Sequence, residues 1–514
     1  MNDVARLAGE TLCVGVSGRD LDAVARDELT ALGPGAFVLF TRNVSTLERT
    51  RELVCALRTA AGDDLPALVC VDQEGGRVAR LHFDDPAMPS MMALGATRDA
   101  RLAYRAGVRL AGDLRAIGAD VNFAPVLDLA LEGASTVIGT RALGDEPRLV
   151  AELGAALVRG METSAIATAP KHFPGHGATA LDSHTALPTV ATPQAALRER
   201  ELVPFAAAFA AGARAVMSAH IVVSAVDASR PATLSPRVLT TLLRDELGFG
   251  GVCFTDCLQM DAVSANVGTV GAAVLALAAG ADCCIISHDL ALARGARDAI
   301  VAAVAHGSLP YERLAEAAGR VRALRGALAR EGATPLVEDR SDVAQEIAAR
   351  SVTRVCGDVR LDRAAAVTVV SFEGAAGDGI AASAAERPSL SLALRRRRMR
   401  SELLRVALEP DRAMREMLLD VLSMQGTRNV VIVARRAHLY GAQRETIAEL
   451  LVQVPHAVAI SAREPFDIDV LVRARGVLCS FGDEQSSIEA LADILVGRTE
   501  PSGTLPITWP SALR

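Results

Sequence analysis

The sequence contains little of several residue types, and lysine is the extreme case. Of its 54 Lys and Arg residues only Lys171 is a lysine, so arginine supplies almost every positive side chain. Aromatic residues are also scarce, with 12 Phe, 3 Tyr and 1 Trp, so stacking platforms can contribute little to a binding site. The formal net charge is −7 and no region is strongly basic, which disfavours a nucleic-acid partner. The densest basic run, residues 395–398, is short and typical of a solvated face.

Long apolar runs are absent as well. No stretch reaches the roughly 18 consecutive apolar residues of a transmembrane helix, and residues 1–4 do not begin a secretory signal, so we expect no membrane partner. The nine cysteines lie mostly in apolar runs, which is typical of buried free thiols in a reducing compartment. These absences predict a globular, cytoplasmic protein without disulfides, and 514 residues allow two or more domains.

The sequence does contain a regular alternation of short apolar runs with amphipathic segments rich in Ala, Leu and Arg. Continuous apolar strands that alternate with helices are typical of a parallel sheet covered on both faces. Eight such units in the first part of the chain favour a (β/α)8 barrel over an open sheet. The expected strands are residues 12–16, 36–40, 67–72, 120–127, 166–171, 215–221, 251–255 and 281–287.

A stretch rich in charges and helix breakers, residues 331–340, interrupts this pattern. Further apolar runs follow it, again alternating with helical segments, at residues 365–371, 429–434, 456–461 and 476–480. They predict a smaller α/β sandwich domain with a mostly parallel sheet. The expected organisation is a barrel domain at 1–335, a linker at 336–350 and the second domain at 351–514.

Polar residues follow many of the expected barrel strands. In such a barrel the active site lies at the C-terminal ends of the strands, so these side chains would face one cavity. Any one of them could instead cap the next helix, but chance scatter would not readily give the whole set. The set consists of Arg42, Asp72, Asp128, Lys171, His172, His220, Asp256 and His288.

Asp256 directly follows an apolar strand, in the segment Cys253-Phe-Thr-Asp-Cys257. Its carboxylate would point into the barrel mouth and could attack an anomeric carbon. Cleavage of a glycosidic bond needs two carboxylates, or their equivalents, beside that bond. The alternative is that Asp256 caps the helix that follows it.

The segment richest in histidine is residues 171–184, with three of the nine histidines of the chain. His172 and His176 have the spacing of two metal ligands on a helix, but a proline and a glycine between them interrupt any helix, so we expect no metal site. Farther along, Asp182 can accept a hydrogen bond from Nδ1 of His184. That bond would fix the imidazole as an oriented general acid and base.

The segment Asp72-Gln-Glu-Gly-Gly-Arg-Val78 also follows a strand. Its paired glycines allow a close backbone turn while Asp72 faces the barrel mouth. Glu74 is a rival nucleophile by charge alone. The plainer alternative is that Glu74 pairs with Arg77 or Arg80.

Together these segments resemble glycoside hydrolase family 3, and within it the β-N-acetylhexosaminidase branch. The resemblance spans nearly the whole chain in the family's order, and the combination of Lys-His-Phe-Pro-Gly-His-Gly with Asp-Ser-His is its most specific part. The matching segments are Asp72-Gln-Glu-Gly-Gly-Arg-Val-Ala-Arg80, Asn122-Phe-Ala-Pro-Val-Leu-Asp128, Val137-Ile-Gly-Thr-Arg141, Lys171-His-Phe-Pro-Gly-His-Gly177, Asp182-Ser-His184, Thr255-Asp256 and Glu500-Pro-Ser-Gly-Thr-Leu-Pro-Ile-Thr508.

The resemblance implies a retaining mechanism without a metal or organic cofactor. Asp256 would be the nucleophile, His184 the acid/base and Asp182 its orienting partner. The implied substrates are oligosaccharides with a terminal non-reducing β-N-acetylglucosaminide, as in cell-wall muropeptides, and the enzyme would act as a monomer or homodimer. The residues that would hold the terminal sugar are Asp72, Arg80, Arg141, Lys171 and His172.

Lys171 fits this assignment, because a compact ammonium can donate to sugar hydroxyls in a tight site where a planar guanidinium would not fit. Three alternatives remain: a phosphorylase, a β-glucosidase-type enzyme and a non-catalytic sugar-binding protein. The phosphorylase stays open because a histidine base would not repel phosphate as an anionic glutamate would.

The second domain carries few chemical signals. Glu464 and Asp483 are its spare carboxylates, and we expect them to be surface or helix-capping residues. Arg435 and Arg436 stand at a strand end and could reach the active site or a partner subunit.

Overall fold

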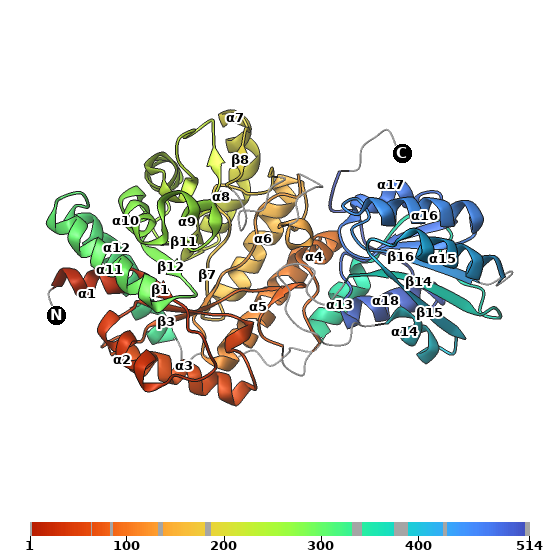
Figure 1. Ribbon diagram of the computed structural model, residues 1–514, viewed down its shortest axis with the longest axis horizontal. Helices are drawn as coiled ribbons and strands as arrows, with labels where there is room; N and C mark the ends of the chain where they lie inside the picture. The colour runs from red at the N-terminus through yellow and green to blue at the C-terminus, as the bar shows by residue number, and fades with distance from the viewer. Residues whose placement is uncertain are drawn as a thin grey trace.

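The computed structural model describes residues 3–62, 64–82, 86–131, 137–179, 187–331, 342–374, 389–424 and 429–508. They form a barrel and, beside it, a smaller sheet domain (Figure 1). The predicted fold class, a (β/α)8 barrel followed by an α/β sandwich with a mostly parallel sheet, is confirmed.

All eight expected barrel strands are present and pair in parallel, in the order β7-β6-β3-β2-β1-β12-β11-β9. Backbone hydrogen bonds from Phe173 to Met217 and from Met217 to Pro170 join the two ends of this order, so the sheet closes into a ring. The strands are β1 (Leu12–Val14), β2 (Ala36–Leu39), β3 (Leu68–Val71), β6 (Val121–Asn122), β7 (Ala167–Thr168), β9 (Ala215–Met217), β11 (Val252–Cys257) and β12 (Cys283–Ile286).

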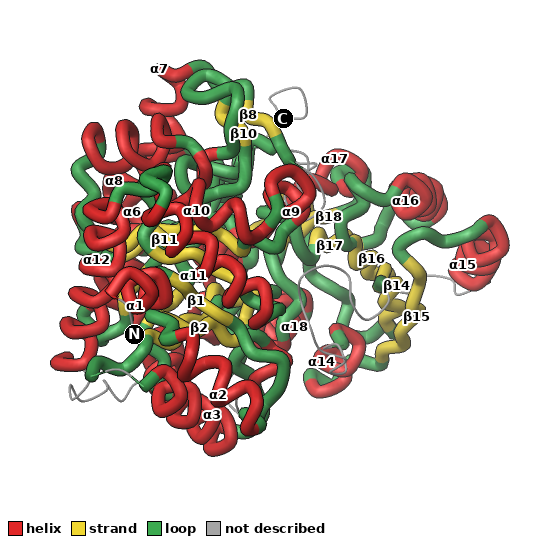
Figure 2. The backbone as a smooth tube through the Cα atoms, turned by 60° about the vertical axis from the view of Figure 1, so that its left-hand side comes forward, coloured by secondary structure: helices red, strands yellow, loops and turns green. Residues whose placement is uncertain are grey.

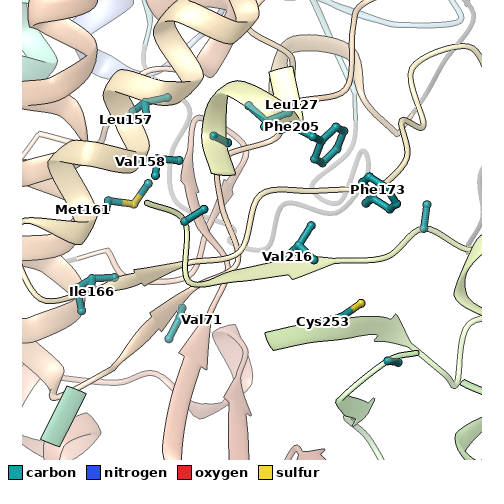
Figure 3. Close-up of a cluster of buried hydrophobic side chains, with 14 of the residues drawn as sticks. Val71, Leu127, Leu157, Val158, Met161, Ile166, Phe173, Phe205, Val216 and Cys253 are labelled. Carbon is teal, nitrogen blue, oxygen red and sulfur yellow. The ribbon is translucent and has the colours of Figure 1, made fainter. Parts of the chain in front are cut away.

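Both faces of these strands are buried, as their continuous apolar sequences predict. In β3, Leu68 and Cys70 belong to the cluster inside the barrel, whereas Val69 and Val71 belong to the cluster beneath the surrounding helices. Figure 3 shows part of the outer cluster, whose labelled members are Val71, Leu127, Leu157, Val158, Met161, Ile166, Phe173, Phe205, Val216 and Cys253. The alternation in β3 is what period-two strand geometry requires when both faces pack.

The barrel interior is a packed core rather than a channel. Helix α12 contributes apolar side chains to the inner cluster, namely Val321, Leu324 and Leu328. Three fully buried thiols also belong to it, those of Cys13, Cys70 and Cys283.

Helices surround the barrel strands (Figure 2). Several begin after residue types that commonly cap helices. The side chains of Thr46, Ser90 and Asp99 accept hydrogen bonds from backbone N–H groups of the first turn. The helices are α1 (Asp3–Glu10), α2 (Ala23–Leu32), α3 (Leu47–Ala61), α4 (Met91–Thr97), α5 (Ala100–Ile117), α6 (Pro147–Glu162), α7 (Gln194–Ala196), α8 (Leu202–Ala210), α9 (Asp261–Val267), α10 (Thr269–Ala279), α11 (Leu290–Ala305) and α12 (Tyr311–Glu331). Two short strand pairs lie in the loops, β4 (Gln73–Gly75) with β5 (Val78–Ala79) and β8 (Thr189–Val190) with β10 (Val222–Val223).

The second domain is a six-stranded sheet in the order β13-β18-β17-β16-β14-β15, parallel except for β13. The four expected runs form β14 (Val367–Glu373), β16 (Asn429–Ala434), β17 (Val458–Ser461) and β18 (Gly476–Cys479). The sequence does not predict the edge strands β13 (Thr353–Gly357) and β15 (Ser401–Ala407), whose side chains are partly exposed, so neither is a continuous apolar run.

Helices cover both faces of this sheet (Figures 1 and 2). One face packs on α14 (Leu390–Arg396) and α18 (Gln485–Leu495). The other packs on α15 (Arg412–Met424), α16 (Gly441–Gln453) and α17 (Ile468–Leu471).

The two domains share an interface. Helix α13 (Asp342–Ser351) falls largely within the segment expected to be a linker, of which residues 336–341 lie outside the described part. It contacts α4 and α5 of the barrel and α18 of the second domain. The barrel's core cluster also includes second-domain side chains, those of Ile468, Cys479, Phe481 and Ile507.

No single helix among the described residues is long and apolar enough to cross a bilayer. Helices α9 and α10 would together have the length and apolar composition of a membrane span, but they meet at a bend of 102°.

Candidate active site

A cavity of about 270 Å³ lies at the C-terminal ends of the barrel strands. This volume is close to the lower end of the range for small-molecule sites, about 300–1,000 Å³, so it suits one small ring better than an extended chain. Its polar and charged lining residues are Asp72, Glu74, Arg80, Arg141, Lys171, His172, His176, Asp256, Gln259, Ser287 and His288.

One wall of the cavity is an array of paired charges. Lys171 Nζ lies 2.6 Å from Asp72 Oδ1 and 2.6 Å from Glu74 Oε1. Glu74 also accepts two hydrogen bonds of 2.8 Å from the Arg141 guanidinium, and Arg80 lies 3.7 Å from Asp72. Lys171 is 2% exposed and Glu74 1%, so these ionic contacts are shielded from water.

The structure corrects the expected partner of Glu74, which pairs with Arg141 and Lys171 rather than with Arg77 or Arg80. Burial would raise the pKa of Glu74, but Arg141 and Lys171 outweigh it and hold that pKa well below its usual range. Because both oxygens are occupied by cations, Glu74 is a poor candidate for the nucleophile. Its geometry suits a residue that fixes the two cations.

The segment after β7 is anchored by Asp128, which is fully buried. Asp128 accepts a 2.6 Å hydrogen bond from the backbone of His176 and lies 2.6 Å from Nδ1 of His172. Burial would raise the pKa of Asp128, but His172 and the backbone of His176 lower it overall. Since Nδ1 of His172 faces Asp128, the ring edge carrying Nε2 points away from that carboxylate.

Close packing explains the glycine that ends the Lys-His-Phe-Pro-Gly-His-Gly segment. A Cβ atom at Gly177 would overlap the backbone carbonyl of Leu129, so no other residue fits there. Within the same segment the Lys171–His172 and Phe173–Pro174 peptide bonds are cis.

His172 and His176, two of the three described histidines that line the cavity, have polar partners of their own. His176 Nδ1 lies 2.7 Å from the Thr179 hydroxyl, and burial lowers the pKa of His176 to about 4. The His172 and His176 rings are 5.8 Å apart, edge to face. Among the described residues no group of three His, Cys, Asp or Glu side chains is arranged to hold a metal ion.

Asp256 lies in β11 and lines the cavity. The helix-capping alternative is wrong, because α9 begins only at Asp261 and Met260 occupies its N-cap position. One oxygen of Asp256 accepts a 2.7 Å hydrogen bond from the backbone of Cys257. Strands β3 and β11 are four positions apart in the eight-stranded ring, so Asp256 faces the array of Asp72 and its partners across the cavity.

Comparison with known proteins adds a second line of evidence. The model of the glycosyl hydrolase family 3 N-terminal domain matches residues 9–324, and that of its C-terminal domain matches residues 359–514. The chain belongs to glycosyl hydrolase family 3. It is therefore a glycoside hydrolase, and its substrates are oligosaccharides.

Individual relatives of this family 3 hydrolase agree with that assignment. A β-hexosaminidase of Stenotrophomonas maltophilia (strain K279a) is 43% identical over 286 residues, which cover 54% of this chain and 83% of the relative. The solved family 3 β-N-acetylglucosaminidase of Paenibacillus sp. str. FPU-7 is 34% identical, with a TM-score of 0.92 over 99% of each chain. A solved β-glucoside phosphorylase, 20% identical, shares the fold with a TM-score of 0.81 over 99% of this chain and 94% of its own.

Some of the predicted strand-end residues of this family 3 hydrolase do not line the cavity and instead support it from outside. His220 is fully buried and hydrogen-bonds the Thr233 hydroxyl and the backbone carbonyl of Cys257, so it supports the strand that carries Asp256. Arg42 stacks on Phe40 and donates to backbone carbonyls. His288, in contrast, does line the cavity.

The predicted acid/base pair, Asp182 and His184, lies outside the described residues. Their roles in this family 3 hydrolase stay predictions. The last described residue before them is Thr179, two positions after Gly177.

Sequence reasoning missed the part of the lining that lies beside Asp256. Cys257 follows it directly, and its thiol lies 3.0 Å from the Ser287 hydroxyl, which in turn lies 2.7 Å from His288 Nδ1. Ser287 closes the expected β12 run, so its position at a strand end was the signal that could have found it.

In the second domain the structure shows where the two spare carboxylates and the two arginines lie. Glu464 is 1% exposed, so it is not a surface residue; it precedes the short helix η6 (Pro465–Asp467) at the N-cap position, but its side chain makes no capping hydrogen bond. Arg435 pairs with Asp483 at 2.9 Å inside that domain, and Arg436 lies 3.7 Å from Glu464. None of the four is part of the cavity lining.

Proposed function

We propose that this family 3 hydrolase is a retaining β-N-acetylglucosaminidase that removes terminal non-reducing β-N-acetylglucosamine through a covalent glycosyl-enzyme intermediate. The observation that carries the proposal is Asp256, which faces a cationic wall across a cavity sized for one sugar ring. The names of the Stenotrophomonas and Paenibacillus relatives, a hexosaminidase and an N-acetylglucosaminidase, support the choice of sugar.

In the first proposed step, a carboxylate oxygen of Asp256 attacks the anomeric carbon while the bond to the aglycone oxygen breaks. His184, oriented by Asp182, donates its proton to that departing oxygen. The electron pair of the broken bond stays with the aglycone, and the sugar becomes an ester of Asp256.

In the second step His184 takes a proton from water, and the oxygen of that water bonds to the anomeric carbon. The ester bond breaks, so Asp256 is released as a carboxylate and the sugar keeps its β configuration. Throughout, the proposed sugar ligands are Asp72, Arg80, Arg141, Lys171 and His172. We assign Glu74 the role of holding Lys171 and Arg141 at their positions.

We extend the proposal to muropeptides released from the cell wall and to the cytoplasm as the place of reaction. Muropeptides end in the β-linked sugar that the site is proposed to accept. The nine cysteines of the chain are free thiols, which suits a reducing compartment.

The test compares aryl β-N-acetylglucosaminide with aryl β-glucoside, each with and without phosphate, on the wild type and Asp256→Asn. We expect the wild type to cleave the N-acetylglucosaminide faster, to release free sugar even in phosphate, and to lose roughly 10⁴-fold of kcat/KM in Asp256→Asn. Asp261→Asn is the matched control, because Asp261 is an exposed acid five positions farther along the chain.

Each other outcome points to one alternative. Sugar 1-phosphate as the main product indicates a phosphorylase, and faster glucoside cleavage indicates a β-glucosidase. No turnover of either glycoside leaves only sugar binding. Proton NMR of the first product separates retention from inversion, since a retaining enzyme forms the β-anomer first.

His184 is tested with two kinds of substrate. We expect His184→Ala to abolish cleavage of natural disaccharides but to slow glycosylation less for aryl glycosides whose leaving group needs no proton. Equal losses on both substrates would argue against His184 as the leaving-group acid.

A further inference from the structure

A carboxylate of the second domain reaches the barrel behind the charged wall of the cavity. Glu464 follows β17, and its side chain is buried. It lies against Gly139, in the loop that carries Arg141, where a Cβ atom would overlap the Glu464 carboxylate. Gly139 has a φ of +46°, which glycine adopts without strain. Glycine is therefore favoured here both by the backbone conformation and by the closeness of Glu464.

Guanidinium groups surround this carboxylate. Arg436 lies 3.7 Å from Glu464 in the same domain, and Arg77 comes from the barrel. Burial would raise the pKa of Glu464, but Arg436, Arg77 and Arg463 outweigh it and lower that pKa. Burial, with added repulsion from nearby arginines including Arg141, lowers the pKa of Arg77 to about 10. Glu464 thus supplies negative charge to a buried region that is crowded with cations.

Hydrogen bonds connect this region to the cavity wall. Arg77 donates to the backbone carbonyl of Val137 at 2.7 Å, and Arg141 donates to the same carbonyl at 3.1 Å. Val137 and Arg141 both line the cavity. Glu464 therefore meets the loop that presents Arg141 at Gly139, and Arg77, which Glu464 attracts electrostatically, bonds the same loop at Val137.

We propose that Glu464 is a positioning residue that acts across the domain interface and holds the loop 137–141 so that Arg141 faces the sugar. Its carboxylate attracts Arg77 and Arg436 and fills the space beside Gly139. The charged wall is therefore complete only when the second domain is docked. The effect on sugar binding rests on the proposed function, whereas the effect on the loop does not.

The first experiment measures backbone hydrogen exchange in the free enzyme, with no sugar present. We expect Glu464→Gln, which keeps the size but removes the charge, to speed exchange across residues 137–142 at least tenfold. Glu162→Gln is the matched control, because the Glu162 side chain is only 10% exposed, pairs with Arg214 at 2.5 Å, and accepts backbone hydrogen bonds from Thr168 in β7 and from Arg214 just before β9. It is expected to leave exchange at 137–142 unchanged.

The second experiment measures N-acetylglucosamine binding by calorimetry in a double-mutant cycle. We expect Glu464→Gln to raise the dissociation constant about tenfold in the wild type but less than twofold in an Arg141→Lys background, because the effect passes through Arg141. Glu464→Asp keeps the charge and is expected to recover most of the affinity.

Unchanged exchange at 137–142, or equal losses in both backgrounds, would overturn the proposal. If Glu464→Gln does not fold, Gly139→Ala carries the test. It displaces the loop while every charge is kept, and we expect the same rise in local exchange. An enzyme that shows the exchange effect but cleaves no N-acetylglucosaminide refutes the proposed function and leaves the role of Glu464 in the loop standing.

Discussion

Glu74 accepts two parallel hydrogen bonds from the guanidinium of Arg141, each 2.8 Å long. Such bidentate pairs are both strong and geometrically specific. Oε1 of Glu74, which accepts one of these two bonds, also lies 2.6 Å from Lys171 Nζ, so one buried carboxylate sets the positions of two cations. The cationic wall is consequently organised before any substrate arrives.

The first prediction concerns that carboxylate. Glu74→Gln leaves Arg141 and Lys171 buried with less negative charge, so we expect the free energy of unfolding to fall by about 3 kcal/mol and kcat/KM by at least tenfold. Urea unfolding and glycoside assays measure the two effects. Glu52→Gln is the control, because Glu52 is 67% exposed and pairs with Arg49 on the surface. Its loss is expected to stay within about 0.5 kcal/mol. A variant with wild-type stability would contradict this role for Glu74.

The second prediction concerns the single lysine. Lys171 lies between two carboxylates at 2.6 Å each, with 2% of its surface exposed, so the larger guanidinium of Lys171→Arg has no room. We expect KM for the N-acetylglucosaminide to rise at least tenfold, although the charge is kept. Lys171→Met, which removes the charge without adding bulk, separates the two effects. Unchanged kinetics in Lys171→Arg would show that the site does not distinguish the two cations.

The third prediction concerns pH. The pKa of His176 is lowered from 6.5 to about 4 by burial. The unfolded chain therefore takes up a proton near pH 6.5, whereas the folded protein does so only near pH 4, and the fold loses stability as the pH falls between these values. The full difference corresponds to about 3 kcal/mol. We expect the loss of unfolding free energy between pH 7.5 and pH 4.5 to be about 2.5 kcal/mol smaller in His176→Gln. Equal losses in both proteins would refute this assignment.

The fourth prediction separates stability from activity. Asp282 is fully buried just before β12 and accepts hydrogen bonds from Arg244, Arg313 and Arg320 at 2.6–3.1 Å. We expect Asp282→Asn to lower the free energy of unfolding by about 3 kcal/mol, because three arginines lose their shared anion. kcat/KM per folded molecule should stay within twofold, since this is the barrel end opposite the cavity.

Asp298→Asn is its control, because the Asp298 side chain is 63% exposed and pairs with its neighbour Arg297. We expect it to change the free energy of unfolding by less than about 0.5 kcal/mol. A fall in kcat/KM of Asp282→Asn larger than its loss of folded protein would place Asp282 in the functional site instead.

The barrel strands were predictable from the sequence for a physical reason. Each is buried on both faces, so its residues form an unbroken apolar run, and the polar side chain after it marks the barrel mouth. The same logic predicted the position of Asp256. It failed for β15, an edge strand in which five of the seven residues are partly or fully exposed.

The pairings within the site were not predictable in this way. Glu74 and Arg141 are 67 positions apart, and nearer arginines offered a plainer partner. Glu464 follows a strand and precedes a proline, which is typical of a helix cap. Only the docking of two domains makes it a buried neighbour of Gly139. A contact between residues far apart in the chain depends on the assembled fold, whereas the apolar pattern of a strand can be read from neighbouring residues.

The cysteine thiols in the barrel core become accessible to reagents only when the barrel opens. Cys13, Cys70 and Cys283 are fully buried, and burial raises the pKa of each thiol, so reagents meet them only after the strands part. Cys55 is exposed and reacts at once, while the buried Cys479, in the cluster that both domains share, becomes accessible when the domains separate. Timed alkylation followed by peptide mass analysis would therefore show whether the domains separate before the barrel strands part, with no substitution in the chain.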